Sequence, residues 1–342
     1  MATSDLSGLL EAVAEGRGLT AAEAEAAIDA FMDGSASEIQ MAGLLMGLRT
    51  KGLEPAEVAG GVRALRKAMI PVPSADPTAL VDTAGTGGGS ITTFNISTAA
   101  AFVVAGAGVP VAKHGNRSFT SRCGSADVLE ALGVRIDLTP ERMGEVLAEA
   151  GIVFMFAPLL HPAMRHVGPV RRGLGVTTLM NVLGPLTNPA GARRQVIGVA
   201  DPRLLDLIPD ALRELGHIRA LVVHGEPGMD EVSPVGATRV AELVDGRVRR
   251  YEIDVAELGL EPAQPDGLAG GDPERNAEMV EAVLRGDGGP TRTAVLANAA
   301  AALIVGGAAE DWKDAVDRAA AILDEGSALA ALERLREASN AG

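Results

Sequence analysis

Four glycines occupy six consecutive positions in the stretch GTGGGS, residues 85–90. Glycine has no side chain and loses much backbone entropy on folding, so this density indicates a backbone that something must approach closely. A strand-like run precedes the loop and a helix-like run follows it, which directs backbone N–H groups and a helix N-terminus at an anion. The loop is not a P-loop, and Ser90 replaces the last glycine of GxGxxG. By itself it fits a glycine-rich turn as well as an anion site.

Further polar residues are expected to reach the same place. Asn95, Ser97 and Thr98 stand where the next helix should begin and offer an amide and hydroxyl groups, although helix capping would also explain them. Another strand-like run, GVPVA, leads into KHGNR at residues 113–117. Loops after successive strands of a parallel sheet converge on one edge, so Lys113 should face the glycine loop. KHGNR alone would be a solvated basic turn; paired with the glycine loop it favours a pocket for a polyphosphate.

The composition limits the class of partner. The 342 residues carry a formal net charge of −15, and 47% of them are hydrophobic but only 2% aromatic. The apolar content suffices for a folded core. The chain lacks the basic surface and stacking aromatic side chains that nucleic-acid binders use, so we expect no nucleic-acid partner.

The cysteine count and the N-terminal sequence indicate where in the cell the protein is expected. Cys123 is the only cysteine, which excludes an internal disulfide, and no Cys/His spacing is typical of zinc sites. The N-terminus lacks the basic region of a signal peptide. The weakly polar run 294–309 is shorter than the ~20 apolar residues that span a bilayer. We therefore expect no membrane partner and a cytoplasmic protein.

Residues 1–70 have helical periodicity. One face of a helix carries Leu6, Leu9, Leu10 and Val13, and a second stripe comprises Met41, Leu44, Leu45 and Leu48. Capping boxes are predicted at Thr20 with Glu23 and at Ser37 with Gln40. Gly52 should end one helix and Pro55 begin the next. We predict a small all-helical lobe over residues 1–72, followed by a linker that ends near residue 77.

The rest of the chain alternates short apolar runs with helical ones, which predicts an α/β domain with a central, largely parallel sheet. The apolar runs are LVDT, VPVAKHG, GIVFMFAP, RQVIGVA and RALVVHG. We assign residues 78–164 and 186–342 to this domain, and expect about 165–185 to return to the helical lobe.

Six motifs, in this order, resemble anthranilate phosphoribosyltransferase. They are GTGGGSITTFNIST, KHGNRS, GSADVLEALGV, HPAMRHVGPVRR, NVLGPLTNPAGARRQVIGV and GMDEVSPVGATRVAEL. The match is dense from about Val81 to Leu243. The resemblance implies a fold of the nucleoside phosphorylase-phosphoribosyltransferase type. It also implies transfer of the phosphoribosyl group of 5-phosphoribosyl 1-pyrophosphate (PRPP) to the amine of anthranilate, a step of tryptophan biosynthesis.

The resemblance implies a set of PRPP-binding residues: Gly85, Thr86, Gly87, Gly88, Thr93, Asn95, Ser97, Thr98, Lys113 and Ser125. It implies a magnesium site at Asp230 and Glu231, with Ser97 contributing to a second ion. The chemistry agrees, because Mg²⁺ prefers oxygen ligands and combines one or two carboxylates with substrate phosphates. Two adjacent acids in a loop would otherwise be a solvated turn. No residue is implied as a general base.

For anthranilate, the resemblance implies Gly85, Asn116, His161 and Arg171. The planar fork of an arginine suits the substrate carboxylate. Arg172 is the alternative by register, and we favour Arg171. His114 is as consistent with a structural histidine as with a wall of this pocket.

The sequence departs from the family at the loop. The family commonly has GTGGD, often followed by glycine, where this chain has Gly89 and Ser90. A missing carboxylate removes one metal ligand and one negative charge, so we hypothesise a different magnesium range. Thr177 and Met180 stand where the family often has Arg and Phe, and these two differences weigh little against the resemblance.

Three other functions are each compatible with part of the sequence. A pyrimidine nucleoside phosphorylase would share the fold, but NPAGARR, PVRR and the acidic pair favour the transferase. A nucleic-acid-binding paralogue conflicts with the charge, because phosphate contacts dominate such affinity. A degenerate structural subunit has only Gly89 in its favour. The resemblance also implies a homodimer formed through the helical lobe.

Overall fold

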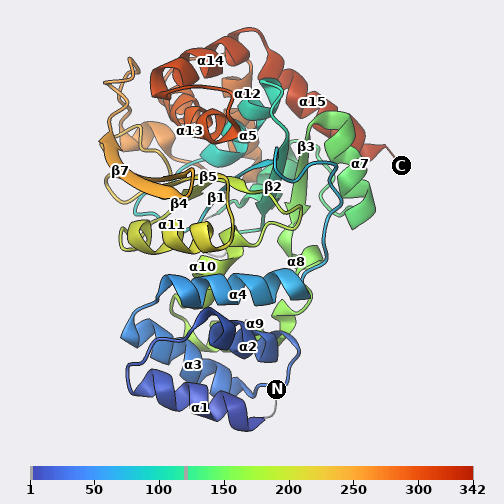
Figure 1. The fold of residues 1–342 in the computed structure, drawn as a ribbon. Coiled ribbons are helices and arrows are strands. Elements are labelled where there is room, and N and C mark those ends of the chain that lie inside the picture. Colours follow the sequence, from blue (N-terminus) through green and yellow to red (C-terminus); the bar gives the residue numbers. More distant parts are fainter. Residues whose placement is uncertain (1–2, 119–121, 342) are drawn as a thin grey trace.

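The computed structural model describes residues 3–118 and 122–341. A helical lobe lies at one end of the molecule and an α/β domain at the other, with the chain passing between them more than once (Figure 1). This arrangement confirms the predicted fold class.

The first four helices build the lobe. They are α1 (Thr3–Ala14), α2 (Ala21–Met32), α3 (Glu38–Lys51) and α4 (Pro55–Ala68). Both predicted capping boxes are present, at Thr20 with Glu23 and at Ser37 with Gln40. Gly52 follows α3 with a φ of 96°, a conformation that favours glycine, and α4 begins at Pro55 as predicted. Local capping signals therefore set the ends of these helices.

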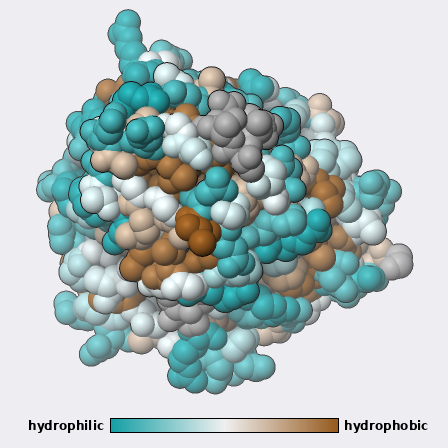
Figure 2. Space-filling view, turned by 90° about the horizontal axis from the view of Figure 1, so that it is seen from below, coloured by the Kyte–Doolittle hydropathy of each residue, from teal (hydrophilic) through white to brown (hydrophobic). Residues whose placement is uncertain are grey.

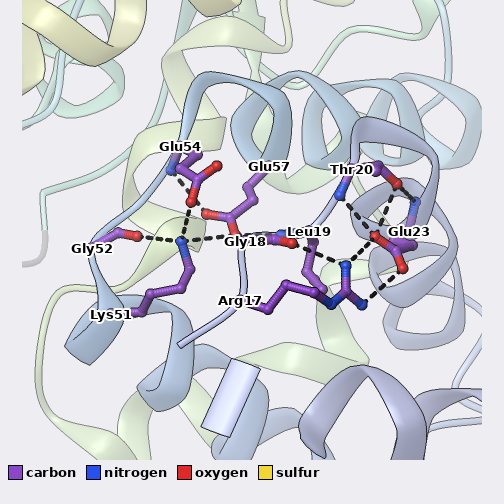
Figure 3. A network of polar contacts seen from close by, with 9 residues as sticks. All are labelled: Arg17, Gly18, Leu19, Thr20, Glu23, Lys51, Gly52, Glu54 and Glu57. Carbon is purple, nitrogen blue, oxygen red and sulfur yellow. Dashed lines mark hydrogen bonds and ion pairs between the residues drawn. The ribbon is translucent and has the colours of Figure 1, made fainter. Parts of the chain in front are cut away.

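A buried carboxylate ties two turns of the lobe together (Figure 3). Glu57 on α4 is 0% exposed and accepts the backbone N–H groups of Leu19 and Glu54, each at 2.9 Å. The Lys51 ammonium lies 3.1 Å from it and also donates to Gly52. Two backbone donors and one cation thus satisfy a carboxylate that would otherwise be costly to bury.

Later segments complete the lobe. α9 (Met164–Leu174) packs against α2 and α3, and α10 (Leu179–Leu183) packs against α4. The 3₁₀ turn η1 (Gly184–Leu186) and the short α8 (Ala157–Leu160) flank this excursion.

One sheet organises the α/β domain. Within the described residues it has seven strands in the order β3-β2-β1-β4-β5-β6-β7. The first five along the chain are parallel, and β6 and β7 form an antiparallel hairpin that the sequence analysis did not predict. Their bounds are β1 (Val81–Gly85), β2 (Val111–Gly115), β3 (Ile152–Phe156), β4 (Arg194–Gly198), β5 (Arg219–Gly225), β6 (Thr238–Val244) and β7 (Arg247–Ile253).

Helices cover both faces of the sheet. Figure 1 shows α5 (Ile96–Gly106) and the C-terminal helices above it, and α11 (Leu204–Glu214) between it and the lobe. The strand period of two divides the core accordingly. Leu221 and Val223 belong to the core of the C-terminal helices, whereas Ala220 and Val222 belong to the core shared with α11 and the lobe.

The remaining helices are α6 (Ser125–Ala131), α7 (Pro140–Ala150), η2 (Pro265–Leu268), α12 (Pro273–Leu284), α13 (Pro290–Gly306), α14 (Trp312–Asp324) and α15 (Ser327–Asn340).

None of the helices in the described part of the chain has the length and apolar character needed to cross a bilayer.

Candidate active site

The predicted site residues follow the carboxyl ends of the parallel strands. The glycine loop leaves β1 at Gly85, KHGNR leaves β2, and the segment with Asp230 and Glu231 follows β5. Gly85 pairs with Gly198 at the ends of β1 and β4. The sheet topology therefore brings these loops to one edge, where ligands of open α/β sheets bind.

The glycines of the loop have two different reasons to be glycine. Gly87 and Gly88 have φ values of 72° and 82°, and an added Cβ would meet nothing within 4 Å at either. Their backbone conformation is what requires glycine. Gly85 lacks space instead, because an added Cβ would lie 2.6 Å from the Asp230 carboxylate, whereas a Cβ at Gly89 would lie 3.0 Å from it, a tight contact with the end of a side chain.

The acidic segment is joined directly to the glycine loop. The Gly87 N–H donates to Asp230 Oδ2 at 2.8 Å. Ser90 adds two bonds, from its N–H to the Gly228 carbonyl at 2.9 Å and from its hydroxyl to the Pro227 carbonyl at 2.8 Å. The two motifs, far apart in sequence, form one continuous surface.

Gly198 also shapes the site, and the sequence analysis missed it. An added Cβ at Gly198 would lie 1.7 Å from the Asp230 carbonyl oxygen, so only glycine lets the acidic segment cross the end of β4. The available signal was a glycine at the end of a strand pattern, which marks close approach of another backbone.

Glu231 faces Ser97 and Lys113. Ser97 lies in the first turn of α5, and its backbone, like the Lys113 charge, acts to lower the pKa of the Glu231 carboxylate. Burial and the neighbouring charge of Asp230 raise the pKa of Glu231 to about 8, against the opposing effect of Lys113. Burial also raises the pKa of Asp230. Two acids held together in this way are a strong attractor for a cation.

Lys113 lies beneath the loops. Its ammonium donates to the Thr83 carbonyl at 2.5 Å, to the Thr83 hydroxyl at 3.2 Å and to the Ser97 hydroxyl at 3.3 Å. Burial lowers the pKa of Lys113, whereas the charges of Asp82 and Glu231 oppose this shift. Lys113 therefore places positive charge under the acidic pair.

Asp82 lies close to Lys113 beneath the same loops, and it was not predicted from the sequence as a site residue. It is fully buried and accepts the backbone N–H of His114 at 3.1 Å, the Asn188 amide at 2.8 Å and the Gln195 amide at 3.2 Å. Burial raises the pKa of Asp82, and Lys113 opposes that. Its only sequence signal is a charged residue within an apolar strand run.

Four of the predicted PRPP-binding residues lie at or just before the start of α5. Asn95 occupies the N-cap position but its side chain makes no capping bond. Thr93 and Ser97 are partly exposed, whereas Thr98 is 1% exposed and its hydroxyl has no partner among the described residues. Thr98 lines a small cavity together with Lys113.

KHGNR continues into α6 through a segment that includes residues 119–121, which lie outside the description. The Ser125 hydroxyl donates to the Asn116 carbonyl at 3.2 Å, and an added Cβ at Gly115 would lie 2.3 Å from that hydroxyl. The Asn116 side-chain oxygen accepts the Arg117 N–H at 2.7 Å. Asn116 and Ser125 are thus packed at the end of β2.

His114 and His161 meet edge to edge. Their Nε2 atoms lie 3.2 Å apart, and burial lowers the pKa of His114 to about 3 and that of His161 to about 4, so both are neutral near pH 7. In this contact one Nε2 must donate and the other accept. His114 is a satisfied buried histidine.

Arg171 and Arg172 differ in surroundings. Both lie in the last turn of α9, but Arg172 is exposed and Arg171 is partly buried. Burial lowers the pKa of Arg171, and within the described residues it forms no ion pair. A guanidinium left unpaired in a partly buried place suits an external carboxylate.

The acidic pair can hold magnesium only together with other oxygen ligands. Among the described residues no group of three or more His, Cys, Asp or Glu side chains could hold a metal ion. Asp230, Glu231 and the Ser97 hydroxyl supply oxygen atoms, and Mg²⁺ commonly completes its shell with water and substrate phosphates. The donor set is compatible with magnesium brought in together with a phosphate ligand.

Family comparisons agree with this geometry. Residues 77–329 match the model of the glycosyl transferase family a/b domain, and residues 7–69 match that of its helical bundle domain. The anthranilate phosphoribosyltransferase of Symbiobacterium thermophilum is 50% identical over 332 residues, which cover 97% of each chain. The chain belongs to the anthranilate phosphoribosyltransferase family.

Solved structures of anthranilate phosphoribosyltransferases superpose closely. The Thermus thermophilus structure has a TM-score of 0.92 and 44% identity, covering 97% of this chain and 99% of that one. The Saccharomyces cerevisiae enzyme, in complex with PRPP and Mg, has a TM-score of 0.88 and 26% identity, covering 99% of this chain and 98% of that one. The likeness to anthranilate phosphoribosyltransferases thus includes the helical lobe as well as the sheet domain.

Proposed function

We propose that the chain transfers the phosphoribosyl group of PRPP to the amine of anthranilate, giving N-(5-phosphoribosyl)anthranilate and pyrophosphate for tryptophan biosynthesis. The observation that carries the proposal is the bond between the Gly87 N–H and Asp230. It joins a backbone anion cradle to a pair of acids suited to a cation, which is what a diphosphate leaving group requires.

The glycine loop would hold the diphosphate. Within the turn of Gly85, Thr86, Gly87 and Gly88, the last two offer backbone N–H groups, whereas the Thr86 N–H donates to the Gly198 carbonyl. Thr93, Asn95, Ser97 and Ser125 offer side chains, and Thr98 offers its backbone at the helix N-terminus. Charge-assisted hydrogen bonds contribute roughly 1.5–3 kcal/mol each, and a helix end contributes about 0.3–2 kcal/mol. These donors act on negative charge that grows as the bond from ribose C1 to the diphosphate breaks.

Asp230, Glu231 and Ser97 would hold magnesium as the cofactor. A bound Mg²⁺ supplies Lewis-acid stabilisation to the departing diphosphate. Lys113 supports this arrangement from below, since its ammonium bonds the Ser97 hydroxyl at 3.3 Å.

Anthranilate would bind among Arg171, Asn116, His161 and Gly85, the residues that the family resemblance implies. Arg171 would pair with its carboxylate. The aromatic amine needs no activation by a base, so its orientation toward ribose C1 is the main contribution of the chain. His161, neutral near pH 7 because burial lowers its pKa to about 4, would form a wall of this pocket without acting as a base.

The experiment is the loss of anthranilate fluorescence with purified protein, PRPP and a magnesium series. Loss that requires both PRPP and protein is expected. No loss at any magnesium concentration overturns the proposal, and phosphate with nucleosides then tests the phosphorylase alternative. Inactivity in both assays would favour a degenerate subunit.

Two arginine variants sharpen this test. Arg171→Lys should raise the KM for anthranilate by about tenfold, because one charge-assisted hydrogen bond is worth about 1.5–3 kcal/mol. Arg172→Lys is the matched control on the neighbouring, exposed position. Equal effects of the two variants would contradict the assignment of Arg171.

We also propose that the chain forms a homodimer through the helical lobe and that it acts in the cytoplasm. Ile39 on α3 is 85% exposed. Figure 2 views the lobe end of the molecule, where hydrophobic side chains gather in the middle of the face among hydrophilic ones. An exposed apolar patch of this kind is typical of protein–protein contacts. Light scattering should give twice the chain mass, and Ile39→Glu should lower it.

A further inference from the structure

A buried asparagine on a C-terminal helix contacts one of the proposed PRPP-binding residues. Asn276, in the first turns of α12, is 2% exposed. Its Nδ2 donates to Asn95 Oδ1 at 2.8 Å, although 181 positions separate the two residues in sequence. None of the six family motifs includes Asn276.

Backbone contacts hold the two segments against each other. The Phe94 N–H donates to the Leu268 carbonyl at 2.9 Å, and an added Cβ at Gly270 would lie 2.8 Å from the Thr93 carbonyl. The chain before α12 therefore runs along the end of the glycine loop. Asn276 reaches Asn95 across this contact.

The hydrogen-bond chain fixes which way both amides face. The Gly271 N–H can only donate, and it lies 2.6 Å from Asn276, so the Asn276 atom there must be Oδ1. The Asn276 NH₂ group then faces Asn95 and must meet Oδ1 of Asn95. Consequently the Asn95 NH₂ group faces the opposite way, where one of its N–H groups donates to the Cys123 carbonyl at a long 3.4 Å.

This orientation matters for an anionic ligand. Phosphate oxygens accept hydrogen bonds, so an Asn95 that presents its NH₂ group attracts them and one that presents its carbonyl oxygen repels them. The two orientations of an amide have the same shape, and packing alone does not choose between them. Only a fixed donor or acceptor on the far side can do so.

We propose that Asn276 is a positioning residue that keeps the Asn95 amide turned so that its N–H groups face the phosphates of PRPP. The proposal rests on the function proposed above and extends it to a residue outside the site. Asn276 itself contacts no substrate.

Two variants separate this role from a structural one. Asn276→Asp keeps an acceptor for Gly271 but presents a second oxygen to Asn95, which favours the reversed amide. Asn276→Leu removes the Gly271 acceptor and the donor to Asn95, so that, among the described residues, only the two long Cys123 contacts, each 3.4 Å, still act on the Asn95 amide. A positioning role predicts that Asn276→Asp raises the KM for PRPP by roughly tenfold or more, and by a larger factor than Asn276→Leu does. A purely structural role predicts the reverse order, with Leu the more harmful.

Each variant is measured as the folded enzyme, with thermal unfolding recorded alongside. The KM for anthranilate should stay within about twofold. Inorganic pyrophosphate, titrated calorimetrically without anthranilate, reports phosphate binding even in a variant with little turnover, and its Kd should rise in the same order. Equal effects on the two substrates, or Leu more harmful than Asp, would overturn the proposal.

A double-mutant cycle excludes a simple charge effect. In an Asn95→Ala background, Asn276→Asp should add no further loss of PRPP affinity, because its target is gone. A full additional loss would assign the effect to the new negative charge and overturn the proposal. If Asn95→Ala alone leaves the KM for PRPP unchanged, the inference fails while transferase activity of the unaltered enzyme stands. Absence of that activity would instead contradict the proposed function.

Discussion

The Gly87 N–H and the Asp230 carboxylate are hydrogen-bonded at 2.8 Å although 143 positions separate them. The loop N–H that suits a phosphate oxygen is thus already paired with an acid whose pKa burial raises. A diphosphate must compete with this carboxylate or be accompanied by a cation that neutralises it. Phosphate binding and magnesium binding are therefore expected to be coupled at this contact.

Asp230→Asn tests that coupling. The amide oxygen can still accept the Gly87 N–H, but the charge is gone. We expect magnesium stimulation of the rate to fall by roughly 10²-fold, because metal stabilisation of a leaving group is worth several kcal/mol. The thermal midpoint should rise, because a charge that burial disfavours is removed. An unchanged magnesium curve, measured by anthranilate fluorescence, would contradict this.

Gly198→Ala tests the crossing of the acidic segment over β4. The new methyl would lie 1.7 Å from the Asp230 carbonyl oxygen, so the segment must shift. We expect a loss of about 1–3 kcal/mol in the free energy of unfolding, as for overpacked cores, and a raised magnesium requirement. Gly8→Ala in α1, where nothing lies within 4 Å, is the matched control and should not lower stability. Equal stability of the two variants in denaturant would show that a methyl group at Gly198 does not clash with the acidic segment.

Gly89→Asp restores the residue common in the family. An added Cβ at Gly89 lies 3.0 Å from Asp230 Oδ1, so a third carboxylate would join the acidic pair. The magnesium concentration for half-maximal rate should fall by about twofold or more, since affinity rises with ligand charge. Gly89→Asn has the same shape without the charge and should not reproduce this shift. A superimposable magnesium profile for the Asp variant would end the hypothesis.

Local signals in the sequence predicted the lobe and the placing of the loops. Thr20 and Ser37 specified helix starts through their own side chains, and the loop glycines followed from a strand-to-helix junction. The residues that support the site were not predictable in this way. Asp82, Gly198 and Asn276 act through partners that only the folded sheet brings near, and no spacing rule joins Asn276 to Asn95. The β6–β7 hairpin was likewise missed, because β7 is mostly exposed and carries no apolar run.

Acid should destabilise the protein through its buried histidines. Burial lowers the pKa of His217 and of His114 from 6.5 to about 3, and that of His161 to about 4. Between these values only the unfolded chain binds the proton, so stability falls as the pH falls below 6.5. Each histidine contributes up to about 1.4 kcal/mol per pH unit.

His217→Gln isolates one of these histidines. Its amide can still donate to Gln195, which lies 2.9 Å from His217 Nε2. Denaturant titrations between about pH 6 and pH 4.5 should show a shallower loss of stability for this variant, by up to about 1.4 kcal/mol per unit. Glu231, whose pKa is raised to about 8, has the opposite slope in both proteins and cancels in the comparison. Parallel curves would show that His217 is not protonated on unfolding.

Glu57→Gln tests the buried carboxylate of the lobe. Its two oxygens accept the N–H groups of Leu19 and Glu54 and face Lys51 (Figure 3). An amide replaces one acceptor by a donor, so one backbone N–H is left opposite another donor, and Lys51 keeps only Glu54 as an ionic partner within the described residues. We expect a loss of about 2–4 kcal/mol in the free energy of unfolding. Glu23→Gln, which changes a more exposed carboxylate of the same network, should cost about 1 kcal/mol or less. The KM for PRPP should be unchanged in both variants, because neither residue touches the sheet edge, and a selective rise in that KM would instead link the lobe network to the site.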